Sequence, residues 1–175
     1  MKRIATSLLL CCGLWTTVYA QNMENTAISV GQIAPNLKYP TPDGKTLDLS
    51  TISKDKVILL DFWASWCRPC RTASPRLVAL YEKYKDQKFP SAKNGFTIVS
   101  VSMDKSKEAW IAAIEKDKLT WDYHMSDLGA WDSEPAAIYG VQFIPQAFLI
   151  GPDGKILAKY NFPEEADADL AKMLK

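Results

Sequence analysis

The sequence predicts a single α/β domain built around a central sheet. Two long and almost uninterrupted apolar runs, residues 57–63 and 95–103, are typical of strands buried on both faces. Segments of helical periodicity alternate with these strands, and a hairpin and a last helix follow them. The 175 residues are 47% hydrophobic, which is enough for one well-packed core, and they contain no internal repeat.

The first twenty residues have the order of a secretory signal peptide. A basic start, Met1–Arg3, precedes an apolar run from Ile4 to Trp15, and Val18–Ala20 supplies the small or modest residues of a cleavage site. Because the apolar run is short for a bilayer span, an uncleaved membrane anchor is the weaker alternative. We therefore expect cleavage near Ala20 and a periplasmic or otherwise extracytoplasmic location.

Residues 21–30 are polar and lack periodicity, which predicts a flexible leader before a folded domain at residues 31–175. The domain opens with a predicted hairpin inside residues 31–52. Its turn, Pro42-Asp43-Gly44-Lys45, has apolar residues on both sides. The first long strand, 57–63, comes next.

Four helices are expected after that strand. Their ranges are 67–84, 106–118, 134–139 and 164–175. The first begins at a pair of cysteines and contains Pro75, which is expected to bend it. A second hairpin precedes the last helix. It joins the expected strands 146–150 and 156–160 across Gly151-Pro152-Asp153-Gly154-Lys155.

Composition and charge exclude several classes of function. The 21 Lys and Arg residues against 20 Asp and Glu give a net charge of +1, so no nucleic-acid surface is expected. The one histidine, His124, leaves little material for a metal site or a Ser-His-Asp triad, and we expect it on the surface without a role. No metal or organic cofactor is expected. Three tryptophans are expected to pack inside the protein: Trp110, Trp121 and Trp131.

Two cysteines remain after removal of the predicted signal, Cys67 and Cys70. They follow a buried strand and open a helix, whose unpaired N–H groups and positive end stabilise a thiolate on Cys67. Arg68 places a cation beside it. The spacing lets Cys70 attack a mixed disulfide formed on Cys67. We therefore expect Cys67 to be the exposed nucleophile and Cys70 the resolving thiol of a redox-active pair.

Three alternatives to redox exchange remain weaker. A structural staple gains little, because closing a loop of about four residues contributes only about 2 kcal/mol. A structural zinc site needs four ligands, and the two cysteines have one distant histidine. Two unreactive core cysteines leave the placement of Trp66 and Pro69 around them unexplained.

Two further residues near the pair carry expectations of their own. Asp61 lies within the buried strand, where poor solvation raises the pKa of a carboxyl group toward neutrality. Such a group accepts a proton from a thiol, unless strand alternation turns it outward. Trp66 is expected to form an apolar wall beside Cys67 that contacts substrate, and Trp63 to pack in the core.

Two blocks of the sequence resemble known families. The segment 57–70, centred on Asp61-Phe62-Trp63-Ala64-Ser65-Trp66-Cys67-Arg68-Pro69-Cys70, resembles the active site of thioredoxins. The leader Gly31-Gln32-Ile33-Ala34-Pro35 and the signal resemble the exported TlpA/ResA-like branch, which is related to the AhpC/TSA redoxin group. The second block is 139–150. The resemblance implies a thioredoxin fold with a central mixed sheet, flanking helices and an N-terminal hairpin extension.

The same resemblance implies roles for individual residues. It places a cis proline at Ile144–Pro145 opposite the dithiol, where the Ile144 backbone pairs with a substrate segment. An ordinary trans proline at the start of a strand is the alternative. Asp61 matches the buried acid that accepts the proton of Cys70. A glutamate common in ResA-like proteins three residues after the second cysteine is replaced by Ala73, which weakens transfer of the branch's usual role in cytochrome maturation.

The predicted function is extracytoplasmic thiol-disulfide oxidoreductase, reducing protein disulfides by exchange at Cys67-Arg68-Pro69-Cys70. Pro69 keeps the pattern of reducing thioredoxins, while Arg68 is expected to make the pair somewhat more oxidising. The expected partners are disulfide-bearing exported proteins and a membrane or periplasmic electron donor, with a monomer as the default.

Two other functions remain as alternatives. A thiol peroxidase of the redoxin group is disfavoured, because Ser65-Trp66-Cys67 replaces its Thr-x-x-Cys turn. A non-catalytic exported binding module with the same fold is the other.

Overall fold

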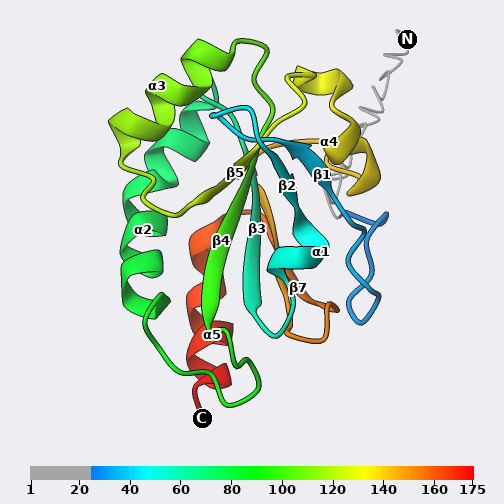
Figure 1. Cartoon of the computed structure of the whole chain (residues 1–175), viewed down its shortest axis with the longest axis vertical. Coiled ribbons are helices and arrows are strands. Elements are labelled where there is room, and N and C mark those ends of the chain that lie inside the picture. The colour runs from blue at the N-terminus through cyan, green and yellow to red at the C-terminus, as the bar shows by residue number, and fades with distance from the viewer. Residues whose placement is uncertain (1–24) are drawn as a thin grey trace, which may run out of the picture.

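The computed structural model describes residues 25–175, so the predicted signal peptide and the cleavage near Ala20 lie outside the described residues. Within this range a five-stranded sheet stands between two layers of helices and loops (Figure 1). The strands of this sheet are β3 (Val57–Trp63), β4 (Phe96–Ser102), β5 (Tyr123–Met125), β6 (Gln146–Ile150) and β7 (Ile156–Tyr160). Their spatial order is β5-β4-β3-β6-β7.

The central strand β3 explains the mixed character of the sheet. It is parallel to β4 and antiparallel to β6, β4 is parallel to β5, and β6 and β7 form the expected antiparallel hairpin. All residues of β3 and β4 are buried, as their continuous apolar sequences predict. The expected mixed sheet is therefore confirmed, and the short strand β5 is an addition that its three residues did not reveal.

The expected N-terminal hairpin is also confirmed. It consists of β1 (Lys38–Pro40) and β2 (Thr46–Asp48), which pair antiparallel, and it is followed by the short helix α1 (Leu49–Ile52). Asp48 caps α1, because its side chain accepts a hydrogen bond from the backbone N–H of Ser50.

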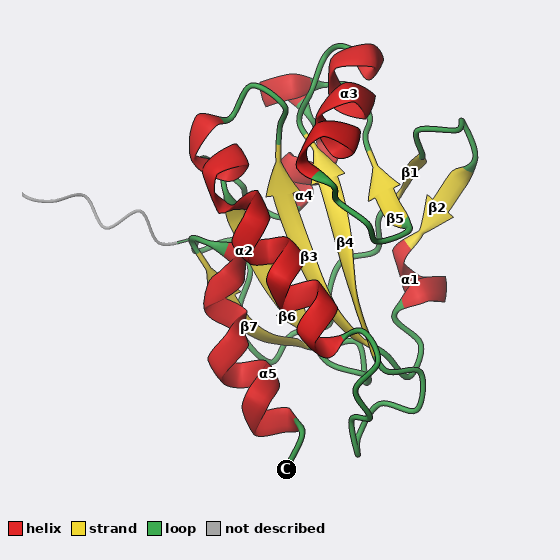
Figure 2. Ribbon diagram, turned by 90° about the vertical axis from the view of Figure 1, so that its left-hand side faces the viewer, coloured by secondary structure: helices red, strands yellow, loops and turns green. Residues whose placement is uncertain are grey.

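Helices cover both faces of the sheet (Figure 2). They are α2 (Arg68–Tyr84), α3 (Lys107–Asp117), α4 (Glu134–Ile138) and α5 (Asp167–Met173), with single 3₁₀ turns η1 (Ala130–Asp132) and η2 (Pro163–Ala166). Helices α2, α3 and α5 lie on one face, and α4 lies on the other (Figures 1 and 2). Helix α2 continues through Pro75, and the expected last helix begins as η2.

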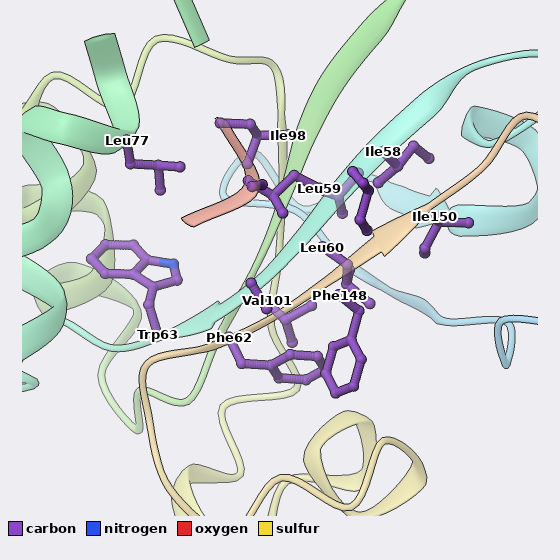
Figure 3. Close-up of a cluster of buried hydrophobic side chains, with 14 of the residues drawn as sticks. Ile58, Leu59, Leu60, Phe62, Trp63, Leu77, Ile98, Val101, Phe148 and Ile150 are labelled. Carbon is purple, nitrogen blue, oxygen red and sulfur yellow. The ribbon is translucent and has the colours of Figure 1, made fainter. Parts of the chain in front are cut away.

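Alternation along β3 divides the core into two halves. Phe62 points toward Phe148 on one side, and Trp63 points toward Leu77 of α2 on the other (Figure 3). Asp61 is two residues before Trp63 and shares the side that α2 covers. Because both faces are covered, no side chain of β3 reaches solvent.

At the end of the predicted leader, Asn25 and Ile28 are 7% and 2% exposed, and Asn25 donates a hydrogen bond to the carbonyl oxygen of Tyr139. Two other expectations, each about a single residue, are wrong. His124 is a buried residue of β5, 5% exposed, and its Nε2 lies 2.9 Å from the carbonyl oxygen of Trp121. Trp131 is not packed inside but is 55% exposed. His124 is buried because β5 pairs with β4, where Ser100 lies opposite it, and three residues of strand were too short a pattern to predict this pairing.

Candidate active site

Cys67 and Cys70 form a disulfide where β3 passes into α2. Their Cα atoms are 5.3 Å apart. Cys67 is the N-cap of α2, and its Sγ accepts a hydrogen bond of 3.2 Å from the backbone N–H of Cys70. The helix start thus points a backbone donor at the sulfur predicted to be the nucleophile. The expected difference in exposure is absent, because the two residues are 4% and 5% exposed in the disulfide form.

The first turn of α2 favours a negative charge on Cys67. It contains Arg68, which is exposed, and no acidic residue. Pro69 occupies one of the first helical positions, where the lack of an N–H costs nothing and the fixed φ suits the helix. The 17-residue length of α2 gives its N-terminus a full helix dipole.

Ile144 and Pro145 lie directly against the dithiol. The peptide bond between them is cis, as the resemblance implied, so the trans alternative is wrong. The carbonyl oxygen of Ile144 is 3.8 Å from Sγ of Cys67. A segment 77 residues away in sequence therefore supplies backbone next to the reactive sulfur.

Asp61 is buried, 3% exposed, on the inner side of the pair. It lines a cavity of about 10 Å³ together with Cys70 and Pro145, just large enough for one water molecule. Burial raises the pKa of Asp61 to about 7, a hydrogen bond of 3.4 Å from Ser100 opposes this, and the charge of Glu164 adds to it. The other carboxyl oxygen, Oδ1, has no hydrogen-bond partner.

The two tryptophans of the motif differ in environment. Trp63 is 2% exposed and packs in the core, as expected. Trp66 is 50% exposed beside Cys67, which agrees with an apolar wall at the site. Its ring lies 5.9 Å from the ring of Trp131, a residue that the sequence pattern did not connect with the site.

Polar contacts that the sequence did not indicate fix the turn before Cys67. Asp104, 1% exposed, accepts hydrogen bonds from the backbone N–H of Ser65 at 2.9 Å and from its hydroxyl at 2.5 Å. Arg71 donates to the carbonyl oxygen of Ser65 at 2.9 Å and forms a bidentate ion pair with Asp117 of α3. Because Asp104 and Asp117 lie 39 and 46 residues from Ser65 and Arg71, the sequence around the cysteines does not indicate these contacts.

Among residues 25–175, no group of three or more His, Cys, Asp or Glu side chains is arranged to hold a metal ion. Within the same range, no helix combines the length and apolar character needed to cross a membrane.

Comparison with known proteins gives a consistent picture. A thioredoxin-like family model matches residues 55–156. The thiol-disulfide oxidoreductase ResA of Bacillus subtilis (strain 168) is 31% identical over 156 residues, covering 89% of this chain and 80% of the relative. ResA of Geobacillus thermodenitrificans (strain NG80-2) is 30% identical over 157 residues, covering 89% and 83%.

Solved structures agree with these relatives. A thiol-disulfide oxidoreductase from Bacteroides fragilis NCTC 9343 superposes with a TM-score of 0.70 at 36% identity, covering 82% of this chain and 100% of that one. The thioredoxin domain of a thiol-disulfide oxidoreductase from Bacteroides vulgatus gives 0.70 at 29% identity, covering 85% and 99%.

The fold, the disulfide at the start of α2 and the family match define the class: the chain belongs to the thioredoxin-like family. Within this family its relatives are ResA proteins and other thiol-disulfide oxidoreductases, and the chain is a thiol-disulfide oxidoreductase of this ResA-like group. These relatives favour neither the peroxidase nor the non-catalytic binding module.

Proposed function

We propose that this protein reduces disulfides of exported proteins, with Cys67 as nucleophile, Cys70 as resolving thiol and Asp61 as proton acceptor. The observation that carries the proposal is the placement of Cys67 at the start of α2, 3.8 Å from the carbonyl oxygen of Ile144. At this point the sulfur of Cys67, the backbone of Ile144 and the exposed Trp66 meet. A substrate segment paired with Ile144 presents its disulfide to Cys67.

The reaction takes place in two exchange steps. The thiolate of Cys67 attacks one sulfur of the substrate disulfide, which forms a mixed disulfide and releases the other substrate sulfur as a thiolate. The thiolate of Cys70 then attacks Sγ of Cys67, which releases the second substrate thiolate and leaves the Cys67–Cys70 disulfide described here. Substrate gains two electrons and the protein loses two. A dithiol donor returns them by the same steps in reverse.

Asp61 supports the second step because it shares the small cavity with Cys70. Cys70 must lose a proton before it can attack. A carboxylate with a pKa of about 7 takes up that proton at neutral pH and releases it again, directly or through a single water in the cavity. Trp66, Ile144 and Pro145 contact the substrate, and Arg68 and Pro69 tune the thiolate of Cys67.

The location and the partners are part of the same proposal. The basic start and apolar run of residues 1–20 support export, with cleavage near Ala20. An exported reductase needs exported proteins with disulfides as substrates, and a membrane-bound or periplasmic dithiol protein as electron donor. The proposed enzyme works as a monomer and without a metal or organic cofactor.

The experiment that tests the direction of transfer is the reduction potential of the Cys67–Cys70 pair, measured by thiol trapping across a dithiothreitol series. A value near about −270 mV is expected for a reductase. A value near about −120 mV would make the protein a disulfide donor instead.

Trapping tests the assignment of the two cysteines. Cys70→Ser is expected to accumulate a mixed disulfide with substrate on Cys67, visible by non-reducing electrophoresis, whereas Cys67→Ser accumulates none. Accumulation in Cys67→Ser and not in Cys70→Ser would reverse the two roles.

A further inference from the structure

A hollow of about 550 Å³ lies immediately beside the dithiol. Its two ends belong to the turn before Cys67 and to the loop that contains η1. Its lining is formed by Ser65, Trp66, Asp104, Lys105, Ser106, Ala109, Ala130, Trp131 and Asp132. The two tryptophan rings, 5.9 Å apart and tilted by 52°, form its apolar side. We call this hollow the Trp66–Trp131 groove.

The two tryptophans of the groove are far more exposed than the other tryptophans of the domain. Trp66 and Trp131 are 50% and 55% exposed, while Trp63, Trp110 and Trp121 are each 2% exposed. Exposed tryptophans gathered at one place are typical of a binding surface, because each offers a large rigid apolar face.

The loop that carries Trp131 is held in an unfavourable backbone conformation. Leu128 and Ala130 have φ values of 56° and 49°, in the left-handed region that residues with a side chain rarely adopt. Two side chains secure it. Asp127 accepts hydrogen bonds from the N–H groups of Gly129 and Glu134 at 3.0 and 2.7 Å, and Ser126 accepts one from Leu128 and donates one to Ser102 of β4.

The opposite wall is equally fixed. Asp104 holds Ser65, and so the turn that carries Trp66, through the hydrogen bonds described above, and accepts a further one of 2.7 Å from Ser102. The two tryptophans are therefore presented by loops tied to the same end of β4, at Ser102. The groove exists before any partner arrives.

Charge around the groove favours a neutral occupant. Asp104 is 1% exposed, and its carboxylate accepts hydrogen bonds from Ser65 and Ser102. The carboxylate also lies close enough to the Arg71 guanidinium to help Asp117 raise the pKa of Arg71. Lys105 and Asp132, both exposed, contribute charges of opposite sign. A charged side chain in the groove would therefore meet both an attractive and a repulsive charge. An apolar side chain would contact two aromatic rings.

We propose that the Trp66–Trp131 groove binds a large apolar side chain of the substrate polypeptide, within a few residues of the cysteine that Cys67 attacks. The inference rests on the proposed function. Trp66 directly precedes the proposed nucleophile Cys67 in sequence, so the groove is continuous with the place where substrate must lie. The protein is thus selective for disulfides flanked by an aromatic or large aliphatic residue.

The test compares peptide substrates that differ in one side chain. Each short peptide carries one cysteine linked to glutathione, with Trp or Ser two residues before or after it. The reduced wild-type protein is expected to reduce a Trp peptide roughly tenfold faster, per unit concentration, than the matching Ser peptide. Trp131→Ala is expected to bring this ratio close to one, and Trp131→Phe to retain most of it.

The control variant is Ile33→Ala. Ile33 is 62% exposed and pairs with Lys155 in an isolated β-bridge. Lys155 follows the end of β6 that lies opposite to Pro145, so the substitution removes an exposed apolar side chain far from the groove. It is expected to keep the wild-type ratio. Because the readout is a ratio of two substrates, a general loss of activity cancels.

Each contrary result identifies which proposal fails. If the wild-type protein reduces no peptide, the proposed function is refuted and the groove with it. If all peptides are reduced at equal rates, or a preference survives Trp131→Ala, the oxidoreductase stands and the groove does not select substrate.

A second copy of this chain is the competing occupant. Sedimentation of the wild-type protein over a range of concentrations is expected to show a monomer throughout. A dimer that Trp131→Ala abolishes would overturn the proposal in favour of self-association through this face.

Discussion

Asp61 is the residue whose chemistry depends most on its surroundings. Its carboxyl group lies in a fully covered strand, receives one long hydrogen bond from Ser100 and leaves Oδ1 without a partner. Burial therefore dominates, and the pKa rises to about 7. If Asp61 accepts the proton of Cys70 as proposed, this raised pKa has one consequence for the reaction rate and another for stability.

The consequence for rate appears in the second exchange step. Asp61→Asn is expected to slow the release of substrate from a preformed mixed disulfide about 100-fold, because the proton of Cys70 loses its acceptor. In the wild type this rate rises with pH through about 7, and the variant lacks that inflection. Single-turnover measurements between pH 5 and 9 test this, and an unchanged profile in the variant would remove Asp61 from the mechanism.

For stability, the same substitution is expected to help rather than harm as the pH rises. Between about pH 4 and pH 7 the folded protein keeps a proton on Asp61 that the unfolded chain has released, so stability falls as pH rises through this window. The wild type is therefore expected to lose on the order of 3 kcal/mol of unfolding free energy between pH 4 and pH 8 relative to Asp61→Asn, whose amide does not titrate. Urea denaturation of both oxidised proteins at the two pH values measures it. A difference between the two proteins that is independent of pH would contradict the raised pKa.

At the scale of elements, η2 connects the C-terminal part of the chain to the site. It packs against α2, β3 and β6, and Pro163 lines the cavity that holds Asp61 and Cys70. Glu164 bonds Arg76 of α2 at 2.6 Å through Oε1, while its Oε2 is buried without a partner. The negative charge of Glu164 thus stays near Asp61 and helps to raise its pKa.

Removing this charge is expected to lower the pKa of Asp61. In Glu164→Gln the pH midpoint of the second exchange step moves down, because one source of repulsion is gone. Arg76→Gln breaks the same contact between η2 and α2 but leaves Glu164 uncompensated, so it is expected to move the midpoint up. Glu165→Gln, an exposed neighbour, serves as the control and leaves it unchanged. Equal shifts in the two variants that break the contact would indicate a structural effect alone.

Elements show clearly what sequence can predict. The strands β3 and β4, the helix α2, both hairpins and the cysteine pair follow from local patterns: continuous apolar runs, Pro-Asp-Gly turns and the spacing of two cysteines. Pro145 and its cis bond required a family resemblance. The exposure of Trp131, the anchoring of Ser65 by Asp104 and the pair Arg71–Asp117 depend on residues 39 to 65 positions apart in sequence, which no local pattern reports.

At the scale of the whole molecule, residues 25–28 connect β7, β6 and the residues that follow α4 through hydrogen bonds. Asn25 donates hydrogen bonds to the carbonyl oxygen of Tyr139 at 2.8 Å and to Oε1 of Gln146 at 3.0 Å. Lys159 of β7 donates to the carbonyl oxygens of Asn25 and Ile28. Because Gln146 directly follows Pro145, this segment also supports β6, the strand that begins at the site.

Gly140 allows residues 25–28 to pack closely against the domain, and its replacement tests how much this packing contributes to stability. A Cβ at Gly140 would lie 2.2 Å from Cβ of Ala27, and the residue has a φ of 62°. Gly140→Ala is expected to lower the unfolding free energy by on the order of 2 kcal/mol and to expose residues 25–28 to limited proteolysis. Gly44→Ala is the matched control: its φ is 82° but the space around it is open, so it costs only about 1 kcal/mol. Equal losses would show that the packing of residues 25–28 adds nothing.

If the predicted signal stayed in a bilayer, the fixed position of Asn25 would limit how far the domain could move from the membrane. Only residues 21–24 lie between the predicted cleavage site and this anchored residue, a tether of about 14 Å at full extension. With the signal retained in a bilayer, the enzyme would meet only disulfides at the membrane surface. Cleavage after Ala20 therefore decides whether its substrates are membrane-bound neighbours or proteins free in the surrounding compartment.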